Sequence, residues 1–311
     1  AMLGKIYESL IAEEERGKAG IFYTPRIEVD LMCRLGVYKY LLQEKDEFLT
    51  KKNIKLKQSL IKFIFIPLEE WNPEESKNFE FLREKINSIK IVDPACGSGA
   101  FLVGMLQVLI ELYMKLGVPP NYELRENIIY NSLYGVDIKD WAVRMAEFRL
   151  WLSLIENEEK IPNKSPILPN FSFKLQCGDS IVQKIGNTQF DLKKHRKKLS
   201  NKLESNLNEI LRLKKRFFKG DKELYEEIKK KQINIIIEDL KNENKKLASE
   251  IKQKTQRTLD GDITNESKKI IKKNNEIIKE NDEIIKKLEN KDIDKLFFWD
   301  LNYPEIMLFV G

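Results

Sequence analysis

The sequence predicts an α/β protein: a parallel sheet with helices on both faces, plus an inserted long helical hairpin. Residues 86–185 alternate short apolar runs with stretches of helical apolar spacing, which is typical of parallel strands joined by crossover helices. Three successive runs end in an aspartate, namely Asp93, Asp137 and Asp179. Residues 192–295 are instead dominated by Lys, Glu, Asn and Ile, with an apolar repeat of seven residues that predicts long helices.

The most informative stretch is the D-P-A-C-G-S-G loop at residues 93–99, between an apolar run and a helix-like run. A strand, a tight glycine loop and a helix N-terminus form a place for a polar small molecule. Gly97 and Gly99 let the backbone approach a ligand, and Asp93 can bind a cationic group. An amino-acid-bearing cofactor such as S-adenosylmethionine fits this loop better than a dinucleotide does. The alternative is a tight turn without a ligand.

Two later aspartates strengthen the case for a ligand. Asp137 ends the short run at residues 133–138, where doubly wound sheets place the acceptor for ribose hydroxyls. Ile138 would then lie against the adenine face. Asp179 ends the alternating run that starts at Phe171, and it is placed to accept a hydrogen bond from an exocyclic amine. For either aspartate alone, the alternative is a turn or a helix cap.

Composition excludes several other classes of site. The three cysteines, Cys33, Cys96 and Cys177, show no C-x-x-C spacing, and the single histidine, His195, lies in a lysine run. We therefore expect no metal site and no histidine-based catalytic triad. Cys96 is either a reactive thiol or, as we favour, a small residue chosen for packing. Because no signal peptide or apolar run of membrane-spanning length occurs, we expect a soluble, cytoplasmic protein without membrane contact.

Pattern changes divide the 311 residues into four parts. Residues 1–60 are a helical region with a cofactor-facing turn, and residues 61–190 are the cofactor-binding core. Residues 191–295 are the helical insertion, and residues 296–311 return to the core. Within the core, residues 61–67 are either a strand or the end of a buried helix. Residues 141–155 are apolar enough for a buried crossover helix, which we favour over a cofactor box.

The insertion carries paired isoleucines every seven residues, at positions 270/271, 277/278 and 284/285. Turn-forming residues near 218–221 and 259–262 interrupt this pattern, so a helical hairpin that folds as a partly independent unit is the simplest prediction. Basic residues exceed acidic ones here, and the whole chain carries a formal charge of +6. This excess either contacts DNA phosphates or simply forms a solvated surface.

The joint order of these motifs resembles the amino-methylating DNA methyltransferases of the gamma arrangement, in particular adenine-N6 enzymes of type IIG restriction-modification systems. The G-I-F-Y-T-P stretch at residues 20–25 is similar to that family's N-terminal motif. The F-W-D-L-N-Y-P-E stretch at residues 298–305 is similar to the segment that precedes its catalytic loop. The resemblance implies a Rossmann-like, S-adenosylmethionine-dependent fold, and double-stranded DNA as the partner of the full-length protein.

The resemblance also assigns roles to residues. Thr24 would hold the methionine carboxylate, Asp137 the ribose, and Asp179 with the backbone of Ser180 the adenine ring. Asp93, Ala95 and Gly97 would line the methionine part. The complete implied cofactor-binding set is Tyr23, Thr24, Pro25, Asp93, Ala95, Cys96, Gly97, Gly99, Phe101, Asp137, Ile138, Asp179 and Ser180.

One departure concerns catalysis. The family methylates with an Asn/Asp-Pro-Pro-Tyr/Phe loop that accepts hydrogen bonds from the flipped base. This chain contains no such tetrapeptide, and V-P-P-N at residues 118–121 has the pattern of a turn that ends a helix. We therefore expect an N-terminal fragment that lacks the catalytic loop and target-recognition region, holds no catalytic residue and is inactive alone. A non-catalytic interaction module acting through the helical arm, or a methyltransferase for RNA or protein, is the alternative. The sequence does not determine the oligomeric state.

Overall fold

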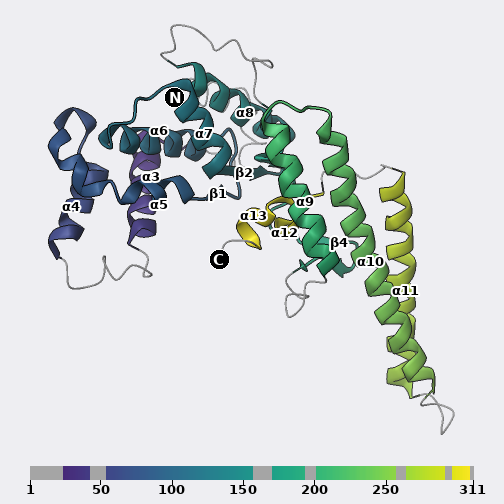
Figure 1. The fold of residues 1–311 in the computed structure, drawn as a ribbon. Helices are drawn as coiled ribbons and strands as arrows, with labels where there is room; N and C mark the ends of the chain where they lie inside the picture. Colours follow the sequence, from purple (N-terminus) through teal and green to yellow (C-terminus); the bar gives the residue numbers. More distant parts are fainter. Residues whose placement is uncertain are drawn as a thin grey trace. The chain divides into compact units, whose positions relative to one another are not determined.

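The computed structural model describes residues 24–42, 54–156, 170–192, 201–256, 264–290 and 296–308 (Figure 1). The chain divides into two compact units, Ala1–Cys177 and Gly178–Gly311. The described residues are mostly helical with a small parallel three-stranded sheet, which is compatible with the predicted α/β class. The features predicted at Tyr23, His195 and residues 259–262 lie outside the described residues.

A parallel sheet lies in the first unit, in the order β1-β2-β3. Its strands are β1 (Ile91–Asp93), β2 (Leu133–Asp137) and β3 (Leu175–Cys177). Asp93 pairs with Gly135, and Asp137 pairs with Cys177. All three strands occur where the apolar runs predicted them, but the third is shorter than the run. The backbone N–H groups of residues 174 and 175 donate to the carbonyl of Phe171, which closes a turn before β3 begins.

Helices connect the strands, as parallel pairing requires. The chain passes from β1 to β2 through α6 (Ala100–Lys115) and α7 (Tyr122–Ser132), and it leaves β2 through α8 (Asp140–Ile155). The predicted helix-ending turn at residues 118–121 is confirmed, because α6 ends at Lys115 and the Val118 N–H donates to the Tyr113 carbonyl at 2.9 Å. The Asn121 side chain then accepts from the Leu124 N–H at 2.9 Å and caps α7. The predicted buried face of α8 is also confirmed at Ala142, Ala146, Leu150 and Leu154.

Helix α3 (Arg26–Leu41) packs on α6. Its inner face carries an apolar residue at every fourth position, Val29, Cys33, Val37 and Leu41, all of them buried. The two helices approach closely at Gly104, where an added Cβ atom would lie only 2.4 Å from Cγ1 of Val29. Glycine is therefore required at this crossing for steric reasons, although it lowers helix propensity.

The segment at residues 61–67 forms the end of helix α4 (Ile54–Phe65), so the helix alternative is correct there. Phe63 lies in the core and stacks on Phe79 with ring centroids 4.7 Å apart. Lys115 is buried and donates to the Phe63 carbonyl at 2.9 Å, which satisfies a terminal carbonyl of α4. The connection to β1 contains short helical turns, η2 (Leu68–Glu70), η3 (Pro73–Phe79) and α5 (Leu82–Ser88).

The second unit combines a small antiparallel ladder with long helices. Its elements are β4 (Lys184–Ile185), β5 (Thr188–Gln189), α9 (Asn201–Phe218), α10 (Leu224–Gln256), α11 (Asn265–Glu289), α12 (Trp299–Asn302) and α13 (Pro304–Met307). Helices α10 and α11 lie side by side (Figure 1). Their hydrogen bonds join residue 244 to 281 and residue 250 to 274, so the two helices run antiparallel.

Asn281 is a polar residue in the apolar seam of these helices. It is completely buried, and its amide donates to Oδ1 of Asn244 at 2.8 Å. Its Oδ1 atom accepts from the hydroxyl of Thr188 at 2.9 Å. One side chain therefore joins α11 to both α10 and β5, and it favours a single register because a shifted register would bury an unpaired amide.

The long helices also hold the last described segment. Lys214 of α9 is buried and donates to the Asn302 carbonyl at 2.5 Å. Gln232 of α10 donates to the Leu301 carbonyl at 3.3 Å. The insertion is predicted to fold as a partly independent unit, and this stays a prediction. Helix α9 and the first part of α10 also satisfy the backbone of residues 301–302.

The helix crossing at Gly104 gives a first prediction. We expect Gly104→Ala to be less stable than Gly36→Ala by about 1–3 kcal/mol, because both gain helix propensity but only Gly104→Ala overpacks a contact. Gly36 is a matched control on α3, since a Cβ atom there meets nothing within 4 Å. Denaturant unfolding of both variants measures the difference, and equal stabilities would contradict the close crossing.

The buried amide gives a second prediction. Asn281→Ala removes partners from Asn244 and Thr188, so we expect the free energy of unfolding of the second unit to fall by about 1–3 kcal/mol. Asn275→Ala is the matched control, because Asn275 is exposed on the same helix. Urea denaturation followed by circular dichroism tests this, and a loss no larger than that of the control would show that the amide does not contribute.

Candidate functional site

The loop at residues 93–99 is tied to the end of β2 by backbone and side-chain hydrogen bonds. The Cys96 N–H donates to the Val136 carbonyl at 2.9 Å, and the Gly97 N–H donates to Oδ2 of Asp137 at 2.8 Å. Within the loop, the Gly99 N–H donates to the Cys96 carbonyl at 2.7 Å. The loop is therefore a fixed structure that joins the carboxyl ends of β1 and β2.

Both loop glycines have backbone angles that side chains rarely adopt. Gly97 has φ of 51° and Gly99 has φ of 79°, in the left-handed region. A Cβ atom on Gly99 would lie 2.9 Å from Cβ of Ala146, so this glycine lets α8 approach the loop. A Cβ atom on Gly97 would meet nothing within 4 Å. The Gly97 side of the loop is therefore open, as a ligand would require.

Two carboxylates lie at the carboxyl ends of the strands that carry this loop. Oδ1 of Asp93 accepts from the Ala95 N–H at 3.2 Å, and Oδ1 of Asp137 accepts from the Lys139 N–H at 2.9 Å. Burial raises the pKa of Asp93, and the nearby charge of Asp137 raises it further. An ionised carboxylate has about four acceptor positions. Both aspartates therefore keep acceptor capacity for a ligand, and a cationic group would relieve their mutual repulsion.

Cys96 packs inside the loop. Its side chain is buried, and burial together with the charges of Asp93 and Asp137 raises the pKa of the thiol far above its usual range. A thiol in such a place stays protonated and is a poor nucleophile. The geometry supports the packing interpretation of Cys96.

The other residues of the first unit that were predicted to bind the cofactor lie before and after this loop in the sequence. Ile138 follows Asp137 and has 62% of its surface exposed. Phe101 is half-buried on α6, and its carbonyl accepts from the Cys33 thiol at 3.8 Å. Thr24 and Pro25 lead into α3, where the Pro25 carbonyl accepts from the Val29 N–H. Among the residues described, no hydrogen bond joins Thr24 to the loop.

Asp179 and Ser180 belong to the second unit. Oδ1 of Asp179 accepts from the N–H groups of Ile181 and Val182, at 2.8 and 2.9 Å, and these bonds lower the pKa of the carboxyl. This is the turn geometry that was the alternative for Asp179 alone. The second oxygen of the carboxylate takes no part in these two bonds.

Sequence reasoning missed a contact of Trp299. Its indole N–H donates to the Ser180 carbonyl at 2.8 Å, and its backbone N–H donates to Oε1 of Gln183 at 3.0 Å. Trp299 thereby holds the turn that follows Asp179. The sequence shows the F-W-D stretch as a motif, but only a contact across 119 positions of the chain shows what the indole binds.

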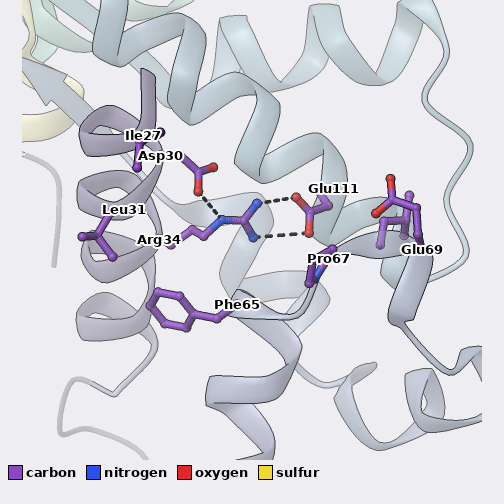
Figure 2. Close-up of a pocket in the computed structure, with 9 residues that line it drawn as sticks. Ile27, Asp30, Leu31, Arg34, Phe65, Pro67, Glu69 and Glu111 are labelled. Carbon is purple, nitrogen blue, oxygen red and sulfur yellow. Dashed lines mark hydrogen bonds and ion pairs between the residues drawn. The ribbon is translucent and has the colours of Figure 1, made fainter. Parts of the chain in front are cut away.

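A separate surface pocket of about 490 Å³ lies among α3, α6 and the end of α4. Figure 2 shows Arg34 at its centre, where the guanidinium binds Asp30 at 2.8 Å and both carboxylate oxygens of Glu111. The other lining residues are Ile27, Leu31, Phe65, Pro67, Leu68 and Glu69. None of them belongs to the predicted cofactor set. Because two carboxylates already neutralise Arg34, this pocket has no free cation for an anionic ligand.

Neither a metal-binding cluster nor a membrane-spanning helix occurs among the described residues. No three His, Cys, Asp or Glu side chains gather in a way that could hold a metal ion there. None of the described helices is both long enough and apolar enough to cross a membrane.

Comparison with known proteins identifies the family. Residues 69–250, more than half of the chain, match the family model of the MmeI DNA-methyltransferase domain. The chain belongs to this family. The matched region includes the glycine loop and Asp137, so the family predicted from the motifs is confirmed.

Individual relatives of this MmeI-type methyltransferase domain agree. The chain is 34% identical over 197 residues to a putative type II restriction enzyme and methyltransferase of Methanocaldococcus jannaschii, covering 58% of this chain and 16% of the relative. A type II restriction enzyme and methyltransferase of Escherichia coli is 27% identical over 199 residues, covering 58% and 18%. The adenine-specific methyltransferase PglX of Lacticaseibacillus casei is 27% identical over 143 residues, covering 46% and 11%. The chain thus spans less than a fifth of these relatives.

Proposed function

We propose that this chain is the cofactor-binding part of an adenine-N6 DNA methyltransferase of a restriction-modification system, with S-adenosylmethionine as cofactor. The observation that carries the proposal is the glycine loop, which is open at Gly97 and is bonded to Asp93 and Asp137 at the ends of β1 and β2. S-adenosylmethionine offers an ammonium, a sulfonium and two ribose hydroxyls, all of which suit two carboxylates. When bound, it supplies the methyl group that is transferred.

The chemistry of the described loop residues supports this cofactor. Asp93 would bind the ammonium directly or through water, because the cation offsets the cost of ionising a half-buried carboxyl. Asp137 would accept from the ribose hydroxyls while still holding the Gly97 N–H. Ile138, which is largely exposed, would cover one face of the adenine ring. Tyr23, Thr24 and Pro25 are proposed as contacts of the methionine carboxylate, by resemblance to the family.

For the adenine ring we propose Asp179 and the backbone of Ser180. The free oxygen of the Asp179 carboxylate can accept from the exocyclic amine, because the other oxygen alone holds the following turn. Trp299 would keep Ser180 in place through the indole hydrogen bond. We also propose that the sheet is Rossmann-like and that the helical insertion is a hairpin.

DNA as substrate, with adenine as the base, is supported by the family and by relatives whose names specify adenine. In such an enzyme the bound cofactor would supply the methyl group to the amine of an extruded adenine, and oxygens of the catalytic loop would accept hydrogen bonds from that amine. The 311 residues contain no N-P-P-Y-type tetrapeptide to supply those oxygens. We therefore propose that the chain binds the cofactor but does not transfer its methyl group alone.

Calorimetric titration with S-adenosylhomocysteine tests the proposal. We expect binding by the wild-type chain, and about 10- to 100-fold weaker binding by Asp137→Asn, because the charge is removed and an NH2 donor replaces one of the oxygens that accept from the ribose hydroxyls. Asp140→Asn is the matched control, since Asp140 is exposed and lies three residues away at the start of α8. No binding by a folded wild-type chain, or equal losses in both variants, would contradict this site. Methyl transfer to DNA by the chain alone would refute the expected inactivity.

The raised pKa of Asp93 gives a pH prediction. The ligand-free carboxyl takes up a proton at a pH above 3.8, whereas a bound ammonium favours its ionised form. Binding therefore releases a proton near that pKa, and affinity should fall as the pH is lowered through it. Titrations across this range should show the fall for the wild-type chain and a flatter profile for Asp93→Asn. A profile unchanged by that substitution would exclude Asp93 as the titrating group.

A further inference from the structure

We propose that Arg149 of α8 is a positioning residue that holds the glycine loop in its ligand-binding conformation. This inference rests on the proposed function only because it names S-adenosylmethionine as the ligand. The loop geometry can be tested without any ligand.

The contact joins one cation to one loop residue. Nη1 of Arg149 donates to the Ser98 carbonyl at 2.9 Å, and the same nitrogen lies 3.2 Å from the Ser98 hydroxyl. Arg149 also accepts a hydrogen bond at its own carbonyl from Ser153 at 3.0 Å. Its guanidinium is partly buried, where a charged donor binds a carbonyl more strongly than it does in water.

A second contact of the same helix supports the loop one residue later. Ala146 precedes Arg149 by three positions, so both side chains lie on one face of α8. A Cβ atom added to Gly99 would lie only 2.9 Å from the Cβ atom of Ala146. Helix α8 therefore packs against Gly99 through a small residue and binds Ser98 through a cation.

The contacts from α8 matter because the loop contains two glycines with positive φ. The Ser98 carbonyl belongs to the peptide whose N–H is that of Gly99, and this N–H donates to the Cys96 carbonyl at 2.7 Å. Fixing the carbonyl on α8 fixes the orientation of that peptide and so supports the positive φ of Gly99. Arginine suits this role, since it stays charged and its planar donor group has a defined direction.

Hydrogen exchange of the ligand-free chain is the first test. We expect Arg149→Met to raise the exchange rates of the Gly97 and Gly99 amides at least about tenfold, because about 1.4 kcal/mol of lost protection corresponds to that factor. Arg149→Lys should restore protection only in part. Arg144→Met is the matched control, because Arg144 lies on the same helix with 70% of its side chain exposed. Unchanged loop exchange in a folded Arg149→Met chain would overturn the proposal.

A split in ligand affinity is the second test. Arg149→Met should weaken S-adenosylhomocysteine about tenfold or more while changing adenosine by less than about threefold, because the loop faces the amino-acid part. A merely structural defect would weaken both ligands together, and that result would also overturn the proposal. If the wild-type chain binds neither ligand, the proposed function fails, and loop exchange alone decides the role of Arg149.

Discussion

The pairing of β1 with β2 is the constraint on which the proposed site depends. Because Asp93 pairs with Gly135, the chain leaves β1 beside the last residues of β2. The Val136 carbonyl and the Asp137 carboxylate can then accept the N–H groups of Cys96 and Gly97. A loop with two left-handed residues has few internal hydrogen bonds of its own, so the neighbouring strand must supply them.

That arrangement brings acidic groups together in a partly buried place. Asp93 and Asp137 repel each other, and burial makes ionisation of Asp93 more costly. Packing inside the loop is satisfied by the neutral thiol of Cys96. A ligand with cationic and hydroxyl groups would remove the main electrostatic cost of this arrangement. The two aspartates therefore destabilise the empty loop and at the same time favour binding of such a ligand.

The helical insertion is part of the supporting structure of the second unit. The buried ammonium of Lys214 has a lowered pKa because of its burial, and it binds the Asn302 carbonyl. Trp299, in the same short segment, binds the Ser180 carbonyl. Hydrogen bonds within one unit therefore connect α9 to the last described segment, and that segment to the Asp179 turn. At the seam of α10 and α11, Asn281 sets the register by the cost of burying an unpaired amide.

By itself, the sequence determined features that arise from neighbouring residues. Apolar runs, glycines with a defined spacing and helix-ending prolines predicted the three strands, the loop and the turn before α7, because local sterics and periodicity control them. Only the tertiary structure decided which side chains meet. Arg149 reaches Ser98 across 51 positions, Lys214 reaches residue 302 across 88, and Trp299 reaches residue 180 across 119. Such contacts leave no periodic trace in the sequence, since they depend on how whole elements pack.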